Sequence, residues 1–238
     1  MNEAHAHAAR VNALFGRIAG VYDLLNRVFS FGFDALWRKR LARAARPADQ
    51  RGRILDLAAG TLEVTAELLN AHPEVRVVAA DFCRPMLVRG LTKGKVRRDG
   101  RLSVFTADAL ALPFAAESMD VVTLAFGLRN MEPRASALTE ILRVLKPGGK
   151  LCVLEFAGAG EPILFGLYNL YLTKVLPLIG RLVSKDQGAY RHLADSVEAF
   201  PTADGLAAEL LEAGFSDVEH ESMTAGIVNL HIAIKGSK

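Results

Sequence analysis

The sequence predicts an α/β fold in which helices cover both faces of a parallel sheet. Short apolar, β-branched runs alternate with helical patterns between residues 53 and 156, as they do in parallel sheets with helical crossovers. A length of 238 residues allows one large α/β domain or two small ones, and a hydrophobic content of 51% supports a sizeable core. Because no linker, repeat or low-complexity tract divides the chain, we expect one domain over residues 1–238.

Five strands and three helices are expected in the alternating part of the chain. The strands are predicted at Arg53–Leu57, Arg76–Ala80, Leu102–Thr106, Asp120–Phe126 and Lys150–Phe156. The helices are predicted at Val64–Ala71, Pro85–Leu91 and Pro133–Leu145, the last ended by Lys146-Pro147-Gly148-Gly149. In such a sheet, ligands bind at the carboxyl ends of the strands.

The closing part of the chain distinguishes between kinds of α/β fold. A helix is predicted at Thr202–Ala213, followed by two strands in hairpin order at Phe215–Ser222 and Ile227–Lys235. This ending departs from a dehydrogenase and is the one expected of a class I methyltransferase, whose last strand inserts antiparallel to the others. We therefore expect a Rossmann-like three-layer sandwich with a mostly parallel seven-stranded sheet and an antiparallel last strand.

The stretch Arg53–Thr61 (RILDLAAGT) indicates a nucleoside-cofactor site. A buried strand ends there in a turn of small residues, where backbone N–H groups can approach a ligand closely. Asp81 follows 21 residues after Gly60 at the end of the next apolar run, which suits a carboxylate that binds two ribose hydroxyls. Tight packing of a helix on a sheet produces the same kind of turn, so that alternative stays open at this point.

Charge and cysteine content narrow the class of protein. The formal net charge is only +3, but Arg38–Arg53 and Arg84–Arg101 are rich in basic residues and suit either anionic lipid head groups or solvated surfaces. Nucleic acid is disfavoured, because aromatic residues do not alternate with these charges. The two cysteines, Cys83 and Cys152, do not suit a disulfide scaffold, and the N-terminus shows no apolar signal core. We therefore expect a cytoplasmic protein.

The segment Ile163–Val183 approaches the length of a membrane span. It contains Asn169, Lys174 and Arg181, and Pro177 interrupts it, so it is not expected to cross a bilayer. An amphipathic or buried helix that covers an apolar pocket or rests on a membrane surface fits better, with plain core packing as the alternative.

Four separated segments carry a resemblance to one enzyme family. They are Tyr22-Asp23-Leu24-Leu25-Asn26 with Ser30-Phe31-Gly32 and Trp37; Ala125-Phe126-Gly127-Leu128-Arg129-Asn130; Arg143-Val144-Leu145-Lys146-Pro147-Gly148-Gly149 with Leu154-Glu155-Phe156; and Tyr190-Arg191-His192-Leu193-Ala194-Asp195-Ser196 with Phe200-Pro201 and Leu230-His231. In their order and spacing they resemble the quinone-biosynthesis C-methyltransferases, the family of demethylmenaquinone methyltransferases and 2-polyprenyl-benzoquinol methylases. The segments span nearly the whole chain.

The resemblance implies S-adenosylmethionine as methyl donor and a reduced quinone with a polyprenyl tail as acceptor. It also implies a helical lid over residues 1–46 and a helical insertion over residues 158–200 that covers the acceptor site. Thr61 matches the cofactor-turn threonine, Asp81 the ribose-binding carboxylate, and Asp108-Ala109 the pair beside the adenine. Phe82 is expected either to pack on the adenine or to belong to the core. The donor-binding residues expected in all are Asp56, Ala58, Gly60, Thr61, Asp81, Phe82, Asp108, Ala109 and Ala125.

Some positions depart from the pattern of the family. Leu62 stands where glycine is common, which removes a residue tolerant of positive φ and adds bulk near the methionine end of the donor. Ala125, Asp34 and Ala157 stand where relatives usually have Ser, His and Ser. These changes leave the identity of the quinone open.

The expected chemistry assigns roles to four further residues. Methylation of a ring carbon needs an ionised neighbouring hydroxyl, and a phenol pKa of roughly 10 makes that ionisation cost about 4 kcal/mol at neutral pH. Arg129 is the expected source of stabilising positive charge, with a surface ion pair as its alternative role. Asn130 is expected to orient the same hydroxyl. Tyr22 and Asp23 are expected to position the quinone or the donor's amino group, or else to anchor a loop.

The favoured function is conversion of demethylmenaquinol to menaquinol. The alternative acceptor is the 2-polyprenyl-6-methoxy-1,4-benzoquinol of ubiquinone biosynthesis. A non-catalytic lipid-binding or scaffold protein, supported by Leu62, and a methyltransferase for an unrelated small molecule also stay open. Peripheral contact with the inner face of the plasma membrane is expected, and a homodimer is one assembly to consider. No metal is expected, because His192 and His231 are not spaced as a ligand pair.

Overall fold

The computed structural model describes residues 3–20, 22–96, 100–158 and 187–237. The apolar segment Ile163–Val183 and most of the expected insertion over residues 158–200 lie outside the described residues. Within the described ranges, no helix is both long enough and apolar enough to cross a membrane.

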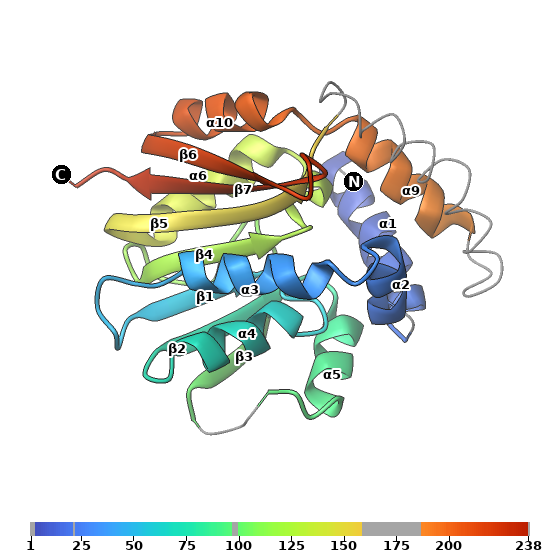
Figure 1. The fold of residues 1–238 in the computed structure, drawn as a ribbon, viewed down its shortest axis with the longest axis horizontal. Coiled ribbons are helices and arrows are strands. Elements are labelled where there is room, and N and C mark those ends of the chain that lie inside the picture. Colours follow the sequence, from blue (N-terminus) through green and yellow to red (C-terminus); the bar gives the residue numbers. More distant parts are fainter. Residues whose placement is uncertain (1–2, 21, 97–99, 159–186, 238) are drawn as a thin grey trace.

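A seven-stranded sheet forms the centre of the described part of the chain (Figure 1). Its strands are β1 (Arg53–Leu57), β2 (Arg76–Asp81), β3 (Leu102–Thr106), β4 (Met119–Ala125), β5 (Leu145–Phe156), β6 (Phe215–Met223) and β7 (Val228–Lys235). They are ordered β3-β2-β1-β4-β5-β7-β6, and only β7 runs antiparallel to its neighbours. The predicted sheet, including its antiparallel last strand, is confirmed.

The start of β5 differs from the prediction. Helix α6 (Arg134–Val144) ends before Lys146-Pro147-Gly148-Gly149 as expected, but these residues already belong to β5 and form an irregular stretch in its pairing with β4. Gly148 has a φ of 73° there, which glycine adopts without a Cβ penalty. The residues Lys146-Pro147-Gly148-Gly149 that end α6 therefore also belong to the first part of β5.

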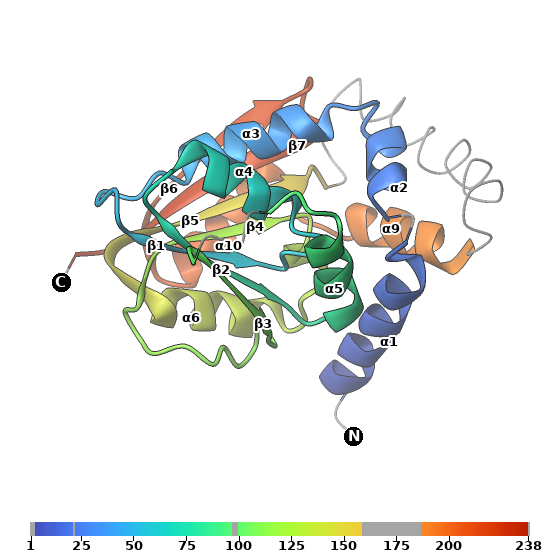
Figure 2. The same ribbon diagram turned by 90° about the horizontal axis from the view of Figure 1, so that it is seen from below.

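Helices cover both faces of the sheet (Figures 1 and 2). The helices α3 (Asp34–Ala44), α4 (Glu63–Ala71) and α5 (Arg84–Thr92) pack on one face, and α6 and α10 (Ala203–Glu212) pack on the other. Neighbouring residues of the central strands enter opposite cores, as Ile54 and Leu55 do. This alternation explains why the central strands are apolar throughout and could be located from the sequence.

The helices α1 (Glu3–Ile18), α2 (Tyr22–Phe29) and α9 (Gln187–Glu198) gather beyond the carboxyl ends of the parallel strands (Figure 2). The expected lid over residues 1–46 is thus only partly placed there. Its last helix, α3, lies on the face of the sheet instead, because Trp37 and Leu41 are buried in the core formed with α4 and β1. Within the described residues, α1 and α2 hold the lid position.

Candidate active site

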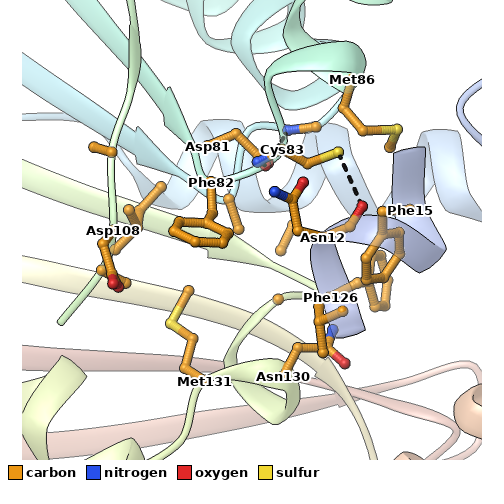
Figure 3. Close-up of a pocket in the computed structure, with 18 of the residues that line it drawn as sticks. Asn12, Phe15, Asp81, Phe82, Cys83, Met86, Asp108, Phe126, Asn130 and Met131 are labelled. Atoms are coloured by element: carbon orange, nitrogen blue, oxygen red, sulfur yellow. Dashed lines mark hydrogen bonds between the residues drawn. The ribbon is translucent and has the colours of Figure 1, made fainter. Parts of the chain in front are cut away.

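A cavity that is partly open to solvent lies at the carboxyl ends of β1, β2, β3 and β4 (Figure 3). Its base comes from the turns that follow these strands, and its cover comes from α1 and α2. The lining residues are Val11, Asn12, Phe15, Tyr22, Leu57, Ala58, Gly60, Asp81, Phe82, Cys83, Met86, Ala107, Asp108, Ala109, Leu110, Ala125, Phe126, Gly127, Asn130, Met131 and Glu132. The cavity lies where the fold predicts a ligand site.

The turn after β1 approaches the cavity with its backbone. Ala58 and Gly60 have positive φ angles of 55° and 53°. A Cβ on Gly127 would lie 2.6 Å from the Cβ of Ala58, so glycine is required where the turns after β1 and β4 meet. Phe126, with a φ of 56°, lies beside this contact and lines the cavity. Such backbone conformations concentrate at functional sites.

Asp81 links the turns after β1 and β2. Its carboxylate accepts hydrogen bonds from the backbone N–H groups of Gly60 and Cys83, both at 2.7 Å. Burial raises the pKa of this carboxyl group, and the two N–H donors oppose the shift. Each carboxylate oxygen has more than one acceptor site, so Asp81 can accept further hydrogen bonds from the cavity. This matches the predicted position of a ribose-binding group.

The predicted adenine-binding residues line one side of the cavity. In Figure 3, Phe82, Asp108 and Met131 lie on the side away from Phe15 and Phe126. The ring of Phe82 is 41% exposed, so this face is open rather than part of the core. Asp108 accepts a hydrogen bond from the backbone N–H of Leu110 at 2.9 Å, which fixes its loop.

Asp56 and Thr61, both predicted to bind the donor, do not line the cavity. Asp56 is 1% exposed and accepts hydrogen bonds from the hydroxyls of Thr65 and Thr123 at 2.6 and 2.9 Å. Its burial raises its pKa to about 6, although the two hydroxyl donors lower it. The Thr61 hydroxyl donates to the carboxylate of Asp23 at 2.5 Å. Both residues thus support the turn from behind.

The expectation that Leu62 adds bulk near the methionine end of the donor is wrong for this structure. Leu62 adopts the left-handed conformation, with φ at 63°, although it is not glycine. Its side chain is 1% exposed and belongs to the core with α3 and α4, outside the cavity lining. A Cβ on Gly90 would lie 2.6 Å from the Leu62 Cγ, so the absence of a side chain in α5 makes room for it.

Arg129 lies at the predicted edge of the sheet, but its side chain does not line the cavity. It belongs to the short 3₁₀ helix η1 (Leu128–Asn130) and forms an ion pair with Glu155, Nη1 to Oε2 at 2.9 Å, with both side chains buried. The same Nη1 donates to the carbonyl oxygen of Phe126 at 2.6 Å, and the guanidinium lies 5.6 Å from the ring centroid of Phe156. The expectation that Arg129 is aimed at the acceptor is therefore not met, because β5 supplies a closer carboxylate.

The other three predicted catalytic residues differ in their placement. Asn130 lines the cavity, and its Oδ1 lies 2.9 Å from Nε2 of His192 in α9. Tyr22 lines the cavity and packs edge-on against Phe15, with ring centroids 5.8 Å apart. Asp23 faces away from the cavity, where it forms an ion pair with Lys93 and accepts from Thr61.

Several residues of α1 and α5 that line the cavity were not among the predicted site residues. Helix α1 was expected only as part of the lid, although Val11, Leu14, Phe15 and Ile18 have amphipathic spacing that could have located it. Cys83 and Met86 line the cavity from the start of α5, and the Cys83 thiol donates to the carbonyl of Asn12 at 3.7 Å. No sequence signal links these residues, because their contact joins segments 71 residues apart.

A match to the ubiE/COQ5 methyltransferase family extends over residues 3–235. The chain belongs to the ubiE/COQ5 methyltransferase family. The ubiquinone/menaquinone biosynthesis C-methyltransferase UbiE of Syntrophotalea carbinolica is 44% identical to it over 97% of this chain and 96% of its own length. The demethylmenaquinone methyltransferase of Thermus thermophilus is 44% identical over 92% of this chain and 98% of its own length. That of Clavibacter sepedonicus is 42% identical over 95% of this chain and 90% of its own length.

Solved structures show the same fold at lower identity. A Thermotoga maritima S-adenosylmethionine-dependent methyltransferase, described as a possible histamine N-methyltransferase, has a TM-score of 0.65 at 17% identity and covers 94% of this chain and 98% of its own. Phosphoethanolamine N-methyltransferase 2 of Haemonchus contortus, in complex with S-adenosylmethionine, has a TM-score of 0.64 at 15% identity. The match covers 84% of this chain and 52% of that protein chain. The fold of this ubiE/COQ5 family member is therefore that of a class I methyltransferase.

This UbiE-type protein is an S-adenosylmethionine-dependent C-methyltransferase. Its cavity suits that donor, because a buried carboxylate, a glycine-dependent close contact of two turns and an exposed aromatic face meet in one space. Among the described residues, no group of three or more His, Cys, Asp or Glu side chains could hold a metal ion. Burial raises the pKa of both cysteine thiols, that of Cys152 to about 12, so neither is an activated nucleophile.

Proposed function

We propose that this enzyme transfers a methyl group to a ring carbon of demethylmenaquinol and forms menaquinol. The observation that carries the proposal is the near full-length similarity to two demethylmenaquinone methyltransferases. The cavity supports it, because beside the proposed donor-binding groups it is lined by Phe15, Tyr22 and Phe126, whose rings suit a planar aromatic acceptor.

The donor is proposed to lie along the turns after β1, β2 and β3. When bound, S-adenosylmethionine supplies an electrophilic methyl group on a sulfonium. Asp81 would accept from the ribose hydroxyls, Phe82 and the Asp108-Ala109 pair would hold the adenine, and Ala58, Gly60 and Ala125 would border the methionine part. Asp56 and Thr61 would act indirectly, since they hold the turn in place. Alignment of donor and acceptor supplies most of the rate in such a reaction.

The acceptor is proposed to contact Tyr22 and Asn130, which line the cavity. Ionising its hydroxyl costs about 4 kcal/mol at neutral pH, so hydrogen-bond donors at that oxygen are needed. Arg129 would serve as a positioning residue, because its bond to the carbonyl of Phe126 and its pair with Glu155 hold the cavity wall. Asp23 would position Tyr22 through its contacts with Thr61 and Lys93.

The decisive assay supplies the pure enzyme with methyl-labelled donor and chemically reduced demethylmenaquinone. Formation of labelled menaquinol is the expected result, and it should persist after dialysis against EDTA if no metal takes part, as we propose. Absence of methylated product from any polyprenyl hydroquinone would contradict a quinol methyltransferase. Tight donor binding without turnover would then favour another small-molecule acceptor, and absence of donor binding would favour a non-catalytic lipid-binding or scaffold protein.

The second candidate acceptor is 2-polyprenyl-6-methoxy-1,4-benzoquinol. It is favoured by the relatives whose names include both ubiquinone and menaquinone biosynthesis, among them the Syntrophotalea protein. Turnover of the two reduced rings with the same prenyl tail, compared as kcat/KM, distinguishes the candidates. A higher value for the benzoquinol would replace our first choice.

We also propose peripheral contact of this cytoplasmic enzyme with the inner face of the plasma membrane, where a polyprenyl substrate resides. Its support is a set of exposed apolar side chains on or beside α2 and α3, namely Leu24, Phe31, Phe33 and Leu36. Leu36→Glu should weaken sedimentation with vesicles that contain anionic lipid, whereas Leu211→Glu, an exposed leucine on α10, should not. Equal binding by all three proteins would contradict this surface. Sedimentation equilibrium over a range of concentrations would test a homodimer.

A further inference from the structure

We propose that His192 is a positioning residue that turns the amide of Asn130 toward the methyl acceptor. The proposal rests on the proposed function and adds a residue to its acceptor site. Asn130 lines the cavity at the end of η1, just after β4. His192 comes from α9, 62 residues later in the chain, and its Nε2 lies 2.9 Å from the Asn130 Oδ1.

The hydrogen-bond chemistry of this pair fixes its direction. An amide oxygen only accepts, so the Nε2 atom of His192 must carry the hydrogen that the pair shares. The neutral Nε2–H form and the imidazolium both meet this condition, and the neutral Nδ1–H form does not. With its oxygen held by α9, Asn130 keeps its two amide N–H donors for the cavity. A neutral donor placed in this way suits an oxygen that gains negative charge.

Among its described lining residues the cavity has no cationic side chain to stabilise negative charge on the acceptor oxygen, so a hydrogen-bond donor is needed there. The described lining residues include the carboxylates of Asp81, Asp108 and Glu132 but no lysine or arginine. The nearby Arg129 does not line the cavity, and its Nη1 is bonded to Glu155 and to the carbonyl of Phe126. A phenolate formed in this space would therefore face carboxylates unless a fixed N–H group pointed toward it. Of the lining residues assigned to the acceptor, Asn130 alone carries an amide, and His192 determines which end of that amide is turned inward.

The position of His192 depends on the packing of α9. Val197 in the last turn of this helix is 2% exposed and Phe200 just after the helix is 5% exposed, so they anchor its end against the rest of the protein. A purely structural role for the His192–Asn130 bond would be to hold α9 against η1. The two roles differ in what they predict, because a structural bond stabilises the fold, whereas a positioning bond changes kcat through Asn130.

The first test compares five variants with wild type in the quinol assay. We expect His192→Phe to lower kcat about tenfold and Asn130→Ala about 100-fold, with the donor Kd and the melting temperature unchanged. His192→Gln, whose amide N–H can donate from a similar position, should recover kcat to within about threefold of wild type. The double variant His192→Phe/Asn130→Ala should equal Asn130→Ala, because His192 acts only through Asn130. Asp195→Asn, on the exposed side of α9, serves as a matched control with unchanged kcat.

Two kinetic results would overturn the proposal. One is wild-type kcat for His192→Phe, and the other is a double variant whose loss is the product of the two single losses. A lower melting temperature together with an unchanged kcat would assign the bond to fold stability alone.

A second readout does not require turnover. Nitrogen-15 NMR of the histidine side chains reports which ring nitrogen carries hydrogen, and the signal lost in His192→Gln identifies His192 among the six histidines. A protonated Nε2 whose shift changes in Asn130→Ala is expected. An unprotonated Nε2 overturns the proposal. If wild type methylated neither quinol, the proposed function would fail, while this spectrum would still decide the assignment of His192.

Discussion

Leu62 shows how a single residue can carry bulk next to a ligand site without entering it. Its left-handed backbone costs about 1–2 kcal/mol relative to the right-handed form. That cost is offset by the burial of a leucine side chain that is 1% exposed, worth about 1.5–3 kcal/mol. The same backbone conformation that is unusual for leucine directs the side chain into the core and leaves the cavity open.

The variant Leu62→Gly is therefore expected to lose stability and to keep donor binding. Glycine relieves about 1 kcal/mol of backbone cost, but the lost leucine leaves a cavity worth about 3–5 kcal/mol. A net loss of about 2–4 kcal/mol in the free energy of unfolding should appear in urea titrations. Calorimetric titration with S-adenosylmethionine should give a Kd within about twofold of wild type. Donor binding that appears only in the variant would contradict the placement of this side chain.

Asp56 is expected to make stability depend on pH. Its pKa is raised from 3.8 to about 6 in the folded protein, so the folded state holds a proton that the unfolded state releases. The resulting stabilisation is fully present below pH 3.8 and is lost as the pH rises through about 6, a difference of about 3 kcal/mol. In Asp56→Asn, unfolding free energies measured from pH 4 to pH 7 should lack this decline. If the unfolding free energies of the variant and of wild type changed in parallel with pH, Asp56 would not be the source of the pH dependence.

At the scale of elements, polar contacts outside the cavity hold α2 against the turn after β1. Asp23 accepts from the Thr61 hydroxyl and pairs with Lys93 at the end of α5. Lys93 also forms an ion pair with Glu63 at 3.1 Å. Glu63 is the first residue of α4 and follows the turn after β1. Because Tyr22 lies next to Asp23 and lines the cavity, this network connects α2 to the turns that form the base of the cavity.

The variant Lys93→Met should weaken donor binding more than the matched variant Lys95→Met. Lys93 is 13% exposed and joins α2 to α4, whereas Lys95 is 57% exposed and pairs with Glu63 alone among the described residues. Loss of Lys93 leaves Asp23 without its cation, so the donor Kd should rise about tenfold, the equivalent of 1.4 kcal/mol. Lys95→Met should change it by less than about twofold. An equal change in the donor Kd for both variants, measured by calorimetry, would contradict a role for the Lys93 ion pairs in donor binding.

The elements differ in how far the sequence could predict them. The central parallel strands β1, β2 and β4 were located to within a few residues because their apolar runs are buried on both faces, as in Ile54 and Leu55. The helices α1 to α3 were expected only as a region, since their partners lie far away in the chain. The direction of Arg129 could not be predicted, because its partner Glu155 reaches it only once β4 and β5 are paired.

At the scale of the whole molecule, the site is a property of the assembled sheet. The base of the cavity comes from turns after the four parallel strands β1 to β4, while its cover comes from α1 and α2. The predicted topology and the position of Asp81 follow from local patterns and the family resemblance. The walls supplied by Asn12 and Phe15 required the packed structure, because nothing in a sequence states which helix closes over an open sheet edge.

A ligand that binds only the assembled site should stabilise the whole fold. At a donor concentration 100 times its Kd, the gain is about 2.7 kcal/mol, which corresponds to a rise of roughly 5 to 10 °C in the melting temperature. Differential scanning fluorimetry should show this rise for wild type and none for Asp81→Ala, which lacks the proposed ribose acceptor. A rise of equal size in both proteins would remove Asp81 from the donor site.

The insertion of β7 between β5 and β6 affects how the sheet forms while the protein chain is being synthesised. In a growing chain the strands β1 to β5 are complete at Phe156, but the partner of β5 begins only at Val228. During that interval the segment Leu151–Leu154, fully buried in the finished protein, borders a sheet edge with unpaired backbone groups. Such an edge is a template for pairing with other chains. In the nascent chain this edge of β5 is therefore open to incorrect pairing until β7 has been synthesised.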